Sequence, residues 1–549
     1  MINFTRNTTF IFILLLAAGC AIRVAPTGGE KDITPPKVLA ATPDTFATNF
    51  NSKTIEIEFD EYFQVNDFGG KLVVSPPLEI TPEYKIKGKK LILTLQDNLR
   101  PNTTYNFNFG TAISDINENT PLGNFNYVFS TGAFIDSLSV SGNVVNAFSL
   151  TAEKGVTVML YTDTGDSLPY KNKPVYFAKT DDGGGFTLSY IAPGQYKIFV
   201  LKETNNNYLY DSEDEQIAFV DSLVQSEKKP ALSFRLFQAP KKKQKLLKNT
   251  YTAPGKLVLL FNKPVQNFKL KNLNDSANTN FYVAEYNTKR DSLIVWFTKK
   301  TSDTLRLAVF DNGIAYDTLK IDARKKLKGT ARSGAAPLDT MLRVTLPTIV
   351  SGKADRLGQI KLDFSHPVAD INWDMIKLYS GTQAVAYKHE YTDSANRQVS
   401  IIYPFSDDTE YKLLAGKGAF TDVFGFKNDS LKSTFTLKPE RDYGTMALNL
   451  TLPDSLGRTY ILQLLNSKNE VLKEQVITRS QKIDYGFLAA GIYGFRLVID
   501  ENKNGKWDTG NYNEHTQPEV VLYSSEKPNI RAAWDLTVEW DLILKRKLK

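Results

Sequence analysis

One stretch of the sequence occurs twice, and the two copies lie 297 residues apart. Residues 191–211 read IAPGQYKIFVLKETNNNYLYD and residues 488–508 read LAAGIYGFRLVIDENKNGKWD, and the two align without a gap. In each copy a turn with glycine leads into an alternating strand, which a polar loop follows. Internal repeats indicate repeated structural units, and a chain of 549 residues is too long for one core. We therefore expect several modules in series.

A second kind of repeat joins a strand that carries a phenylalanine at its end to a turn. The strand copies are TIEIEFDEYF at 54–63, KLVLLFNKPV at 256–265 and QIKLDFSHPV at 359–368. Later in each unit come NTTYNFNFGTAISD at 102–115, DTEYKLLAGKGAFTD at 408–422 and, as a weaker match, DTLRLAVFDNGIAYD at 303–317. These spacings predict modules of about 90 to 100 residues with many short strands, as in an Ig-like β-sandwich.

Both kinds of unit are similar to known families. The unit with the phenylalanine-ended strand resembles the SbsA-type bacterial Ig-like domain of surface-layer and Bacteroidetes-type proteins, through Pro35-Pro36, the strand at 55–63, LRPNTTY at 99–105 and FSTG at 129–132. The unit of the long repeat resembles the carboxypeptidase-regulatory or Cna-B-like domain, whose recurring strand and loop match both of its copies. That resemblance implies a transthyretin-like sandwich.

The fold class expected from these patterns is all-β, with tandem Ig-like and transthyretin-like sandwiches after a cleaved lipoprotein signal peptide. The lysine-rich stretch 241–248 is the best candidate for a linker. The expected divisions are a signal peptide at 1–19, a lipidated tether at 20–35, an SbsA-type Ig-like domain at 36–133, a Cna-B-like sandwich at 134–238, a degenerate Ig-like domain at 239–335, an Ig-like domain at 336–438 and a Cna-B-like sandwich at 439–549.

The N-terminus, MINFTRNTTFIFILLLAAGC, has the pattern of a secretory signal. Arg6 precedes an apolar run that is too short to span a bilayer, and small residues lead to Cys20. This ending resembles the bacterial lipobox, with Ala17 in place of the usual leucine. The resemblance implies that a diacylglyceryl group is attached to the Cys20 thiol and that the chain is cleaved before Cys20. We therefore expect a membrane partner that is reached through a lipid anchor.

The residues after Cys20 indicate which membrane holds the anchor and which face of that membrane the protein occupies. Residue 21 is Ala rather than Asp, so the inner-membrane retention signal of some bacteria is absent, and the outer membrane is favoured. No acidic cluster directly follows Cys20, although such a cluster marks export to the outer face in some Gram-negative groups. This favours the periplasmic face of the outer membrane over the cell surface.

Cysteine and charge exclude several classes of protein. Cys20 is the only cysteine, so an intramolecular disulfide or a zinc site with several thiolates is impossible. The net charge of +7 is small for this length and is spread along the chain, whereas binding to nucleic acid needs a clustered basic face. The basic runs at 241–248 and 545–549 are interpreted as a solvated linker and a solvated tail.

The polar loop of the second long repeat is the candidate metal site. Oxygen-bearing side chains at loop positions one, three, five and nine, with Gly505 at position six, match the spacing of a calcium loop. Position twelve holds Asn511 instead of a bidentate acid. The residues assigned to a weak Ca²⁺ site are Asp500, Asn502, Asn504, Lys506 and Asp508.

The loop of the first copy departs from the calcium pattern in another way. It carries Glu203, Asn205, Asn207 and Asp211, but Tyr208 occupies the place of the glycine. For both loops the alternative is an Asx-rich turn whose side chains bond their own backbone. No other cofactor is expected.

Catalytic patterns are weak. The sequence holds three histidines, His366, His389 and His515, and His366 lies in a Ser-His-Pro turn, which indicates a structural role. No GxSxG, HExxH or phosphate-loop motif is present. We therefore predict that the protein is not an enzyme.

Two functions remain open at this point. The repeats favour a non-catalytic lipoprotein that serves as a structural or interaction scaffold of the cell envelope. The alternative is an adhesion module that binds a glycan or a protein, since aromatic residues of the two loops could stack on sugars. Those aromatic candidates, which could instead cap the cores beneath the loops, are Tyr208, Tyr210, Trp507 and Tyr512.

Overall fold

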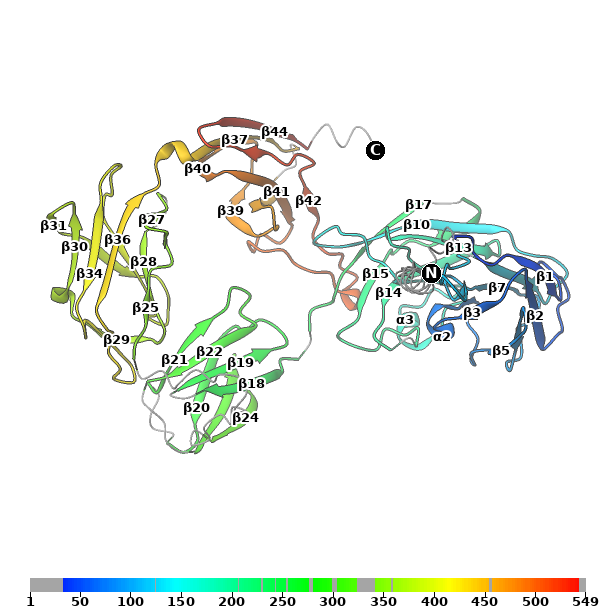
Figure 1. The fold of residues 1–549 in the computed structure, drawn as a ribbon. Coiled ribbons are helices and arrows are strands. Elements are labelled where there is room, and N and C mark those ends of the chain that lie inside the picture. Colours follow the sequence, from blue (N-terminus) through cyan, green and yellow to red (C-terminus); the bar gives the residue numbers. More distant parts are fainter. Residues whose placement is uncertain are drawn as a thin grey trace, which may run out of the picture. The chain divides into compact units, whose positions relative to one another are not determined.

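The computed structural model confirms an all-β chain of tandem sandwiches (Figure 1). It describes residues 33–123, 125–205, 207–228, 231–241, 243–252, 255–275, 280–298, 304–322, 341–356, 359–453 and 457–542. The expected signal peptide, Cys20 and the basic run at 545–549 lie outside these residues. Within the described ranges, no helix has the length and apolar character needed to cross a membrane.

The first sandwich packs a sheet in the order β1-β2-β6-β5 against a sheet in the order β4-β7-β9. The predicted alternation in β2 is confirmed, because Ile55, Ile57 and Phe59 are fully buried while the residues between them are only partly buried. The same sandwich also contains a short antiparallel ladder of β3 and β8. The elements are β1 (Val38–Thr42), β2 (Thr54–Phe59), β3 (Phe63–Val65), α2 (Phe68–Lys71), β4 (Val73–Ser75), β5 (Glu83–Lys87), β6 (Lys90–Thr94), β7 (Thr104–Asn108), β8 (Ile113–Asp115) and β9 (Asn126–Ser130).

The second sandwich has a different strand order. A three-stranded sheet, β13-β10-β17, faces a sheet in the order β12-β11-β14-β15, to which β16 adds through β14. The last strand, β17, runs parallel to the first strand, β10. The elements are β10 (Leu138–Asn146), β11 (Thr157–Tyr161), α3 (Leu168–Lys171), β12 (Tyr176–Lys179), β13 (Gly185–Ile191), β14 (Gln195–Lys202), β15 (Gln216–Phe219), β16 (Val224–Gln225), η1 (Ser226–Lys228) and β17 (Ala231–Leu236).

In the third sandwich, β19 pairs with antiparallel neighbours on both sides, as β2 does in the first sandwich. One sheet has the order β18-β19-β22-β21 and the other has the order β20-β23-β24. Leu257, Leu259 and Phe261 of the repeated strand are buried in its core. The elements are β18 (Leu246–Thr252), β19 (Lys256–Phe261), β20 (Phe268–Asn272), β21 (Tyr282–Tyr286), β22 (Ser292–Phe297), β23 (Thr304–Asp311) and β24 (Ile314–Asp322).

The fourth sandwich extends this pattern. A sheet in the order β25-β28-β33-β32 packs on the sheet β26-β27-β36-β34-β30-β31, of which β30, β34 and β36 lie side by side in Figure 1. The elements are β25 (Val344–Thr345), β26 (Ile349–Val350), β27 (Lys353–Ala354), β28 (Ile360–Phe364), β29 (Val368–Ile371), η2 (Trp373–Met375), β30 (Ile376–Ser380), β31 (Gln383–Val385), β32 (Lys388–Tyr391), β33 (Gln398–Ile402), β34 (Tyr411–Ala415), β35 (Phe420–Asp422), β36 (Leu431–Leu437) and η3 (Glu440–Asp442).

The fifth sandwich repeats the topology of the second. Its three-stranded sheet is β40-β37-β44, with β44 parallel to β37, and its other sheet is β39-β38-β41-β42, with β43 paired to β41. The shared topology agrees with the long sequence repeat. The elements are β37 (Tyr443–Thr451), β38 (Thr459–Asn466), β39 (Val471–Ile477), β40 (Gln481–Ala489), β41 (Gly491–Asp500), η4 (Tyr512–Glu514), β42 (Val521–Tyr523), β43 (Asn529–Ile530) and β44 (Asp535–Asp541).

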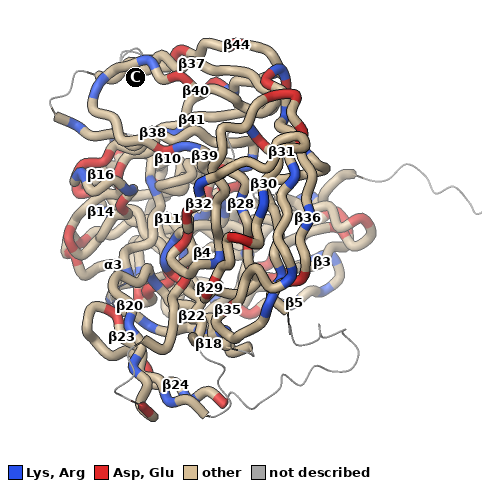
Figure 2. Tube along the Cα trace, turned by 90° about the vertical axis from the view of Figure 1, so that its left-hand side faces the viewer, with Lys and Arg blue, Asp and Glu red and all other residues tan. Residues whose placement is uncertain are grey.

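The chain divides into two compact units. The first comprises residues 1–146 and 151–236, and the second comprises residues 147–150 and 237–549. The short segment 147–150 thus groups with the second unit although its neighbours in sequence belong to the first. The boundaries expected between individual modules stay a prediction. Figure 2 shows basic and acidic segments interspersed along the tube, in keeping with the small net charge of +7.

The tyrosine near the start of the repeated segments at 102–115 and 408–422 has a defined structural role. The hydroxyl of Tyr105 accepts a hydrogen bond from the Arg100 backbone N–H at 2.8 Å, and Tyr411 accepts one from the Ser406 N–H at 2.8 Å. In both, the tyrosine lies five residues after its donor, as in the tyrosine corner of Ig-like sandwiches. The third copy has Arg306 at this place, which explains its weak match.

Replacement of Tyr105 by phenylalanine removes the corner hydroxyl and keeps the ring. The Arg100 N–H then loses its partner inside the protein, so we expect Tyr105→Phe to lower the free energy of unfolding by about 1 kcal/mol. Urea unfolding followed by tyrosine fluorescence measures the change. The control Tyr62→Phe, at a side chain that is 62% exposed, should leave stability unchanged, and equal effects of the two variants would contradict the assignment.

Candidate functional site

The candidate calcium loop begins at the end of β41, where Asp500 is 1% exposed. The Asp500 carboxylate accepts hydrogen bonds from the backbone N–H groups of Asn504 at 3.1 Å and Gly505 at 2.9 Å. Gly505 has a φ of +77°, a left-handed conformation that glycine adopts without steric cost. The acid at loop position one therefore holds the turn at position six.

Asn502 and Asn504 make hydrogen bonds across the loop. Asn502 and Asn504 both donate their amide N–H groups to the Asp508 carboxylate, with Asn502 at 2.6 Å. Their carbonyl oxygens accept backbone N–H groups within the loop, from Asn504 at 3.1 Å and from Lys506 at 3.0 Å. This is the geometry of the Asx-rich turn. The described residues hold no group of three or more His, Cys, Asp or Glu placed to bind a metal. Calcium binding at this loop stays a prediction.

A buried glutamate that the sequence did not single out closes the loop. Glu519 is 8% exposed, and its carboxylate accepts the N–H of Glu501 at 2.8 Å and the N–H of Asp508 at 2.9 Å. Burial raises the pKa of Glu519, and the nearby charges of Asp508 and Asp500 raise it further, while the two backbone hydrogen bonds act in the opposite direction. Glu519 therefore clamps both ends of the loop.

The first copy has the same clamp. Glu215 is fully buried and accepts the N–H of Thr204 at 3.3 Å and the N–H of Asp211 at 3.0 Å. Thr204 and Asp211 align with Glu501 and Asp508 of the second copy. Glu215 follows Asp211 by four residues, whereas Glu519 follows Asp508 by eleven. The unequal spacing hides the equivalence from a gapless alignment.

The remaining residues of the first loop follow the same plan. Glu203 accepts the N–H of Tyr208 at 2.6 Å, as Asp500 accepts that of Gly505. The amide of Asn207 donates to Asp211 at 2.7 Å, and the amide of Asn205 donates to Asp211 at 3.3 Å. Burial raises the pKa of Glu203.

The four aromatic candidates have different surroundings. Tyr210 is buried, which raises its pKa to about 12, and Tyr512 is 2% exposed, so neither ring offers a face to a ligand. Trp507 packs on Phe148 with ring centroids 5.0 Å apart, and its indole N–H donates to the Glu519 carbonyl oxygen at 3.0 Å. Tyr208 is partly exposed and lines a pocket in the first unit.

That pocket has a volume of about 370 Å³ and lies where the first and second sandwiches meet. The two sandwiches are joined there by an ion pair of Lys173 with Glu79 at 2.6 Å. The backbone N–H of Phe177 also donates to the Ser75 hydroxyl at 3.2 Å. A cavity of this size at a junction of two domains is a common place for a ligand.

The histidines lie apart from these loops, except for His515 close after the second. His366 is buried and its Nδ1 lies 2.8 Å from an Asp422 oxygen, beside the rings of Trp296 and Phe424. His389 stacks on Trp373 with ring centroids 3.5 Å apart. These surroundings favour the structural interpretation of His366.

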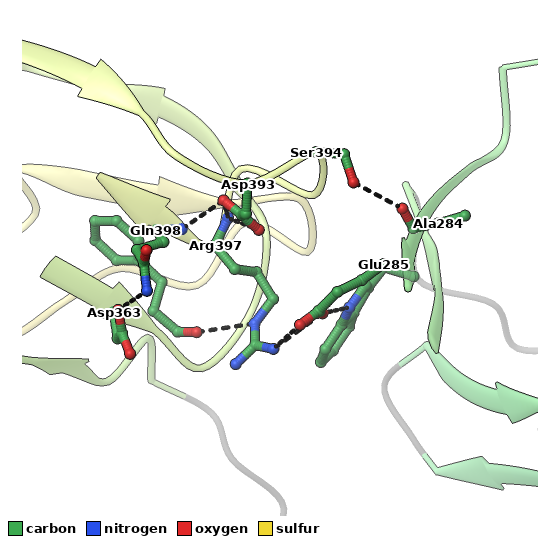
Figure 3. Close-up of polar contacts among 9 residues, drawn as sticks. Ala284, Glu285, Asp363, Asp393, Ser394, Arg397 and Gln398 are labelled. Atoms are coloured by element: carbon green, nitrogen blue, oxygen red, sulfur yellow. Dashed lines mark hydrogen bonds and ion pairs between the residues drawn. The ribbon is translucent and has the colours of Figure 1, made fainter. Parts of the chain in front are cut away.

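Figure 3 shows polar contacts between the third and fourth sandwiches. Arg397 donates from Nη1 to both oxygens of Glu285, at 2.9 and 3.0 Å. Its Nε donates to the Phe364 carbonyl oxygen at 3.0 Å, which fixes the guanidinium in the fourth sandwich. Ser394 adds a bond to the Ala284 carbonyl oxygen at 3.3 Å.

Aromatic packing reinforces the same junction. The Arg397 guanidinium lies over the Trp296 ring, 5.2 Å from its centroid, and the Trp296 N–H donates to Glu285 at 2.9 Å. The Phe424 ring lies so close to Gly255 that a side chain at this position would clash with it. The sequence offered no signal for this cluster, because its members come from distant strands.

Comparison with known proteins identifies one module by sequence. Residues 32–131 match the bacterial Ig-like domain family. A search of the curated proteins found no match. Solved structures with some likeness include the TIE protein of Bacillus anthracis, with 9% identity over 94% of this chain and 76% of that chain, at a TM-score of 0.15.

Two further solved structures show comparable likeness. The major pilin subunit BcpA of Bacillus cereus has 9% identity over 74% of this chain and 99% of its own, at a TM-score of 0.14. The SGBP-B protein of Bacteroides ovatus, solved with a mixed-linkage heptasaccharide, has 12% identity over 72% of this chain and 94% of its own, at a TM-score of 0.17. TM-scores this low carry no argument about function.

The raised pKa of Glu519 predicts a pH dependence of stability. A carboxyl group that binds its proton more tightly when folded makes stability fall as the pH rises above the ordinary value of 4.5. Glu519→Gln cannot ionise, so wild type should lose stability relative to this variant as the pH rises from 4.5 towards 7. Thermal unfolding at several pH values measures it.

The matched control is Glu514→Gln, because Glu514 is an exposed residue of η4 close to the same loop. Its stability should follow that of wild type at each pH. A wild-type stability that rises relative to Glu519→Gln over this pH range would contradict the assignment.

The calcium prediction is tested with Ca²⁺ and with Tb³⁺, whose luminescence Trp507 can excite from within the loop. Millimolar Ca²⁺ should raise the melting temperature, and Asp500→Ala combined with Asp508→Ala should abolish both signals, because both carboxylates are lost. Glu526→Ala, at an exposed acid of the same sandwich, is the control and should retain them. Absence of both signals in the wild-type protein would rule out the site.

Proposed function

We propose that the protein is a non-catalytic lipoprotein that acts as a scaffold of the cell envelope, anchored in the outer membrane through Cys20 with its modules on the periplasmic face. The proposal rests on two kinds of observation. The first is the N-terminal pattern that ends at the sole cysteine. The second is the way neighbouring sandwiches are joined within each compact unit.

The junction of the third and fourth sandwiches is the observation that carries the scaffold role. Arg397 and Glu285 are each 27% exposed, so their ion pair is shielded from solvent more than a surface pair. Charge-assisted hydrogen bonds with a fixed partner are among the stronger polar contacts in proteins. A chain of freely hinged domains would not need such contacts, whereas a spacer that holds modules in place would.

Other junctions have similar contacts. Between the fourth and fifth sandwiches, the Arg356 N–H donates to the Tyr443 hydroxyl at 3.1 Å, and the Arg356 guanidinium lies over the Phe487 ring. In the first unit, the hydroxyl of Thr104 donates to Asp136 at 2.9 Å where the second sandwich begins. Polar and aromatic contacts at these junctions support limited hinge motion between the sandwiches of each compact unit.

The anchor is the part of the proposal that a single substitution tests. Cys20→Ser removes the only thiol that can receive a lipid, so the protein should lose incorporated labelled palmitate and move from the membrane fraction to the soluble fraction. Fractionation of cells followed by immunoblotting measures the shift. Retention of the variant in the membrane fraction would contradict the anchor.

Intact cells test separately whether the modules lie on the periplasmic face or on the cell surface. Protease added outside the cells should leave the wild-type protein uncut, and permeabilisation of the outer membrane should expose it. Cleavage before permeabilisation would place the modules on the cell surface and overturn the periplasmic assignment, whatever the outcome for Cys20.

A further inference from the structure

Tyr208 occupies a backbone position that tyrosine avoids. Its φ is +63°, in the left-handed region where the Cβ of an L-residue comes close to the backbone. The conformation is enforced, because the Glu203 carboxylate accepts the Tyr208 N–H at 2.6 Å. Phe46 and Tyr190 have a similar φ, so this conformation does not mark a site by itself, and the surroundings of the ring decide its use.

The second copy of the loop shows what this position requires. Gly505 aligns with Tyr208, has a φ of +77° and donates its N–H to Asp500, the equivalent of Glu203. The turn is therefore built with glycine in one copy and with a strained tyrosine in the other. Because glycine fulfils the backbone requirement without strain, the presence of tyrosine in the first copy points to a use for its ring.

The Tyr208 ring lies in the wall of a pocket. It packs against Phe177, with centroids 4.7 Å apart, and lines the pocket of about 370 Å³ between the first and second sandwiches. Phe177 is 3% exposed and supports the tyrosine from below, while Tyr208 itself stays partly exposed. No equivalent ring exists in the second copy, where Gly505 has no side chain.

The rest of the lining combines apolar residues and glycines of the first sandwich with five polar side chains. Lys173, Lys179 and Asn207 line the pocket on the side of the second sandwich, and Glu79 and Thr81 line it on the side of the first. Among the lining residues, the two lysines and the glutamate leave one net positive charge, and the Glu203 carboxylate near Lys179 lies outside the lining. One partly exposed aromatic ring among several polar groups suits a ligand that has an apolar face and many hydroxyl groups.

We infer that this pocket binds an acidic saccharide, with a sugar ring stacked on Tyr208. The hydroxyl groups of the sugar would meet Asn207, Thr81 and the ion pair of Lys173 with Glu79, and its carboxylate would meet Lys179. The site goes beyond the scaffold role and does not depend on the lipid anchor. It gives the first unit a ligand that the fifth sandwich, with glycine at this loop position, is not built to take.

Gly69 offers a way to fill the pocket without disturbing the fold. It lines the pocket, and a Cβ built on it would meet no atom within 4 Å. Gly69→Phe therefore places a ring in the space that the ligand needs. Gly486→Phe, at a glycine in the fifth sandwich that is equally open, is the matched control.

The test measures binding to the detergent-solubilised full chain by calorimetry. The acidic probes are oligogalacturonate, alginate and hyaluronan fragments, and the neutral probe is a cello-oligosaccharide. Wild type and Gly486→Phe should bind at least one acidic probe, with the neutral probe about tenfold weaker or more because it lacks the charge that Lys179 pairs with. Gly69→Phe and Tyr208→Gly should bind about tenfold more weakly or worse, since each removes or blocks the aromatic contact.

Stability measurements separate loss of binding from loss of folding. Tyr208→Gly relieves the left-handed strain, so its melting temperature should stay close to that of wild type, and Tyr62→Gly at an exposed tyrosine should leave binding unchanged. Absence of binding to every acidic probe, equal binding of the neutral probe, or full binding by folded Gly69→Phe would each overturn the proposal.

Discussion

Burial of the facing sides of two short sheets is the interaction on which every part of this structure depends. Cys20 is the only cysteine, so no disulfide can staple a module, and each sandwich must be stable through its apolar core. Alternate residues such as Ile55, Ile57 and Phe59 supply that core from one face of a strand. The loops at the ends of the sandwiches are then free to differ.

The parts of the fold that follow from local pattern could be predicted from sequence. The alternating strands, the long repeat and the tyrosine signature each have a short-range cause, and each has a counterpart in the structure. The residues that complete the sites could not be predicted. Glu519 and Glu215 clamp equivalent loops from unequal distances in sequence, and Arg397 meets Glu285 only because two separate sandwiches are in contact.

The second and fifth sandwiches share one loop plan and differ at the turn. In both, an acid at position one holds the turn at position six and a buried glutamate closes the ends. The second copy has glycine at the turn and asparagines gathered on Asp508, whereas the first copy has Tyr208 at the turn, beside a pocket. Sequence comparison shows the substitution, but its meaning depends on the backbone angle and on the neighbouring sandwich.

We propose that neighbouring sandwiches within each compact unit are held in fixed relation by side-chain contacts, which suits a scaffold. Distances between spin labels test this most directly, since Cys20→Ser leaves no other cysteine to be labelled. Labels placed at Lys320→Cys and Lys377→Cys, two exposed positions in the third and fourth sandwiches, report on the junction at Arg397. We expect a narrow distance distribution that broadens in Arg397→Ala. A broad distribution with Arg397 intact would contradict it.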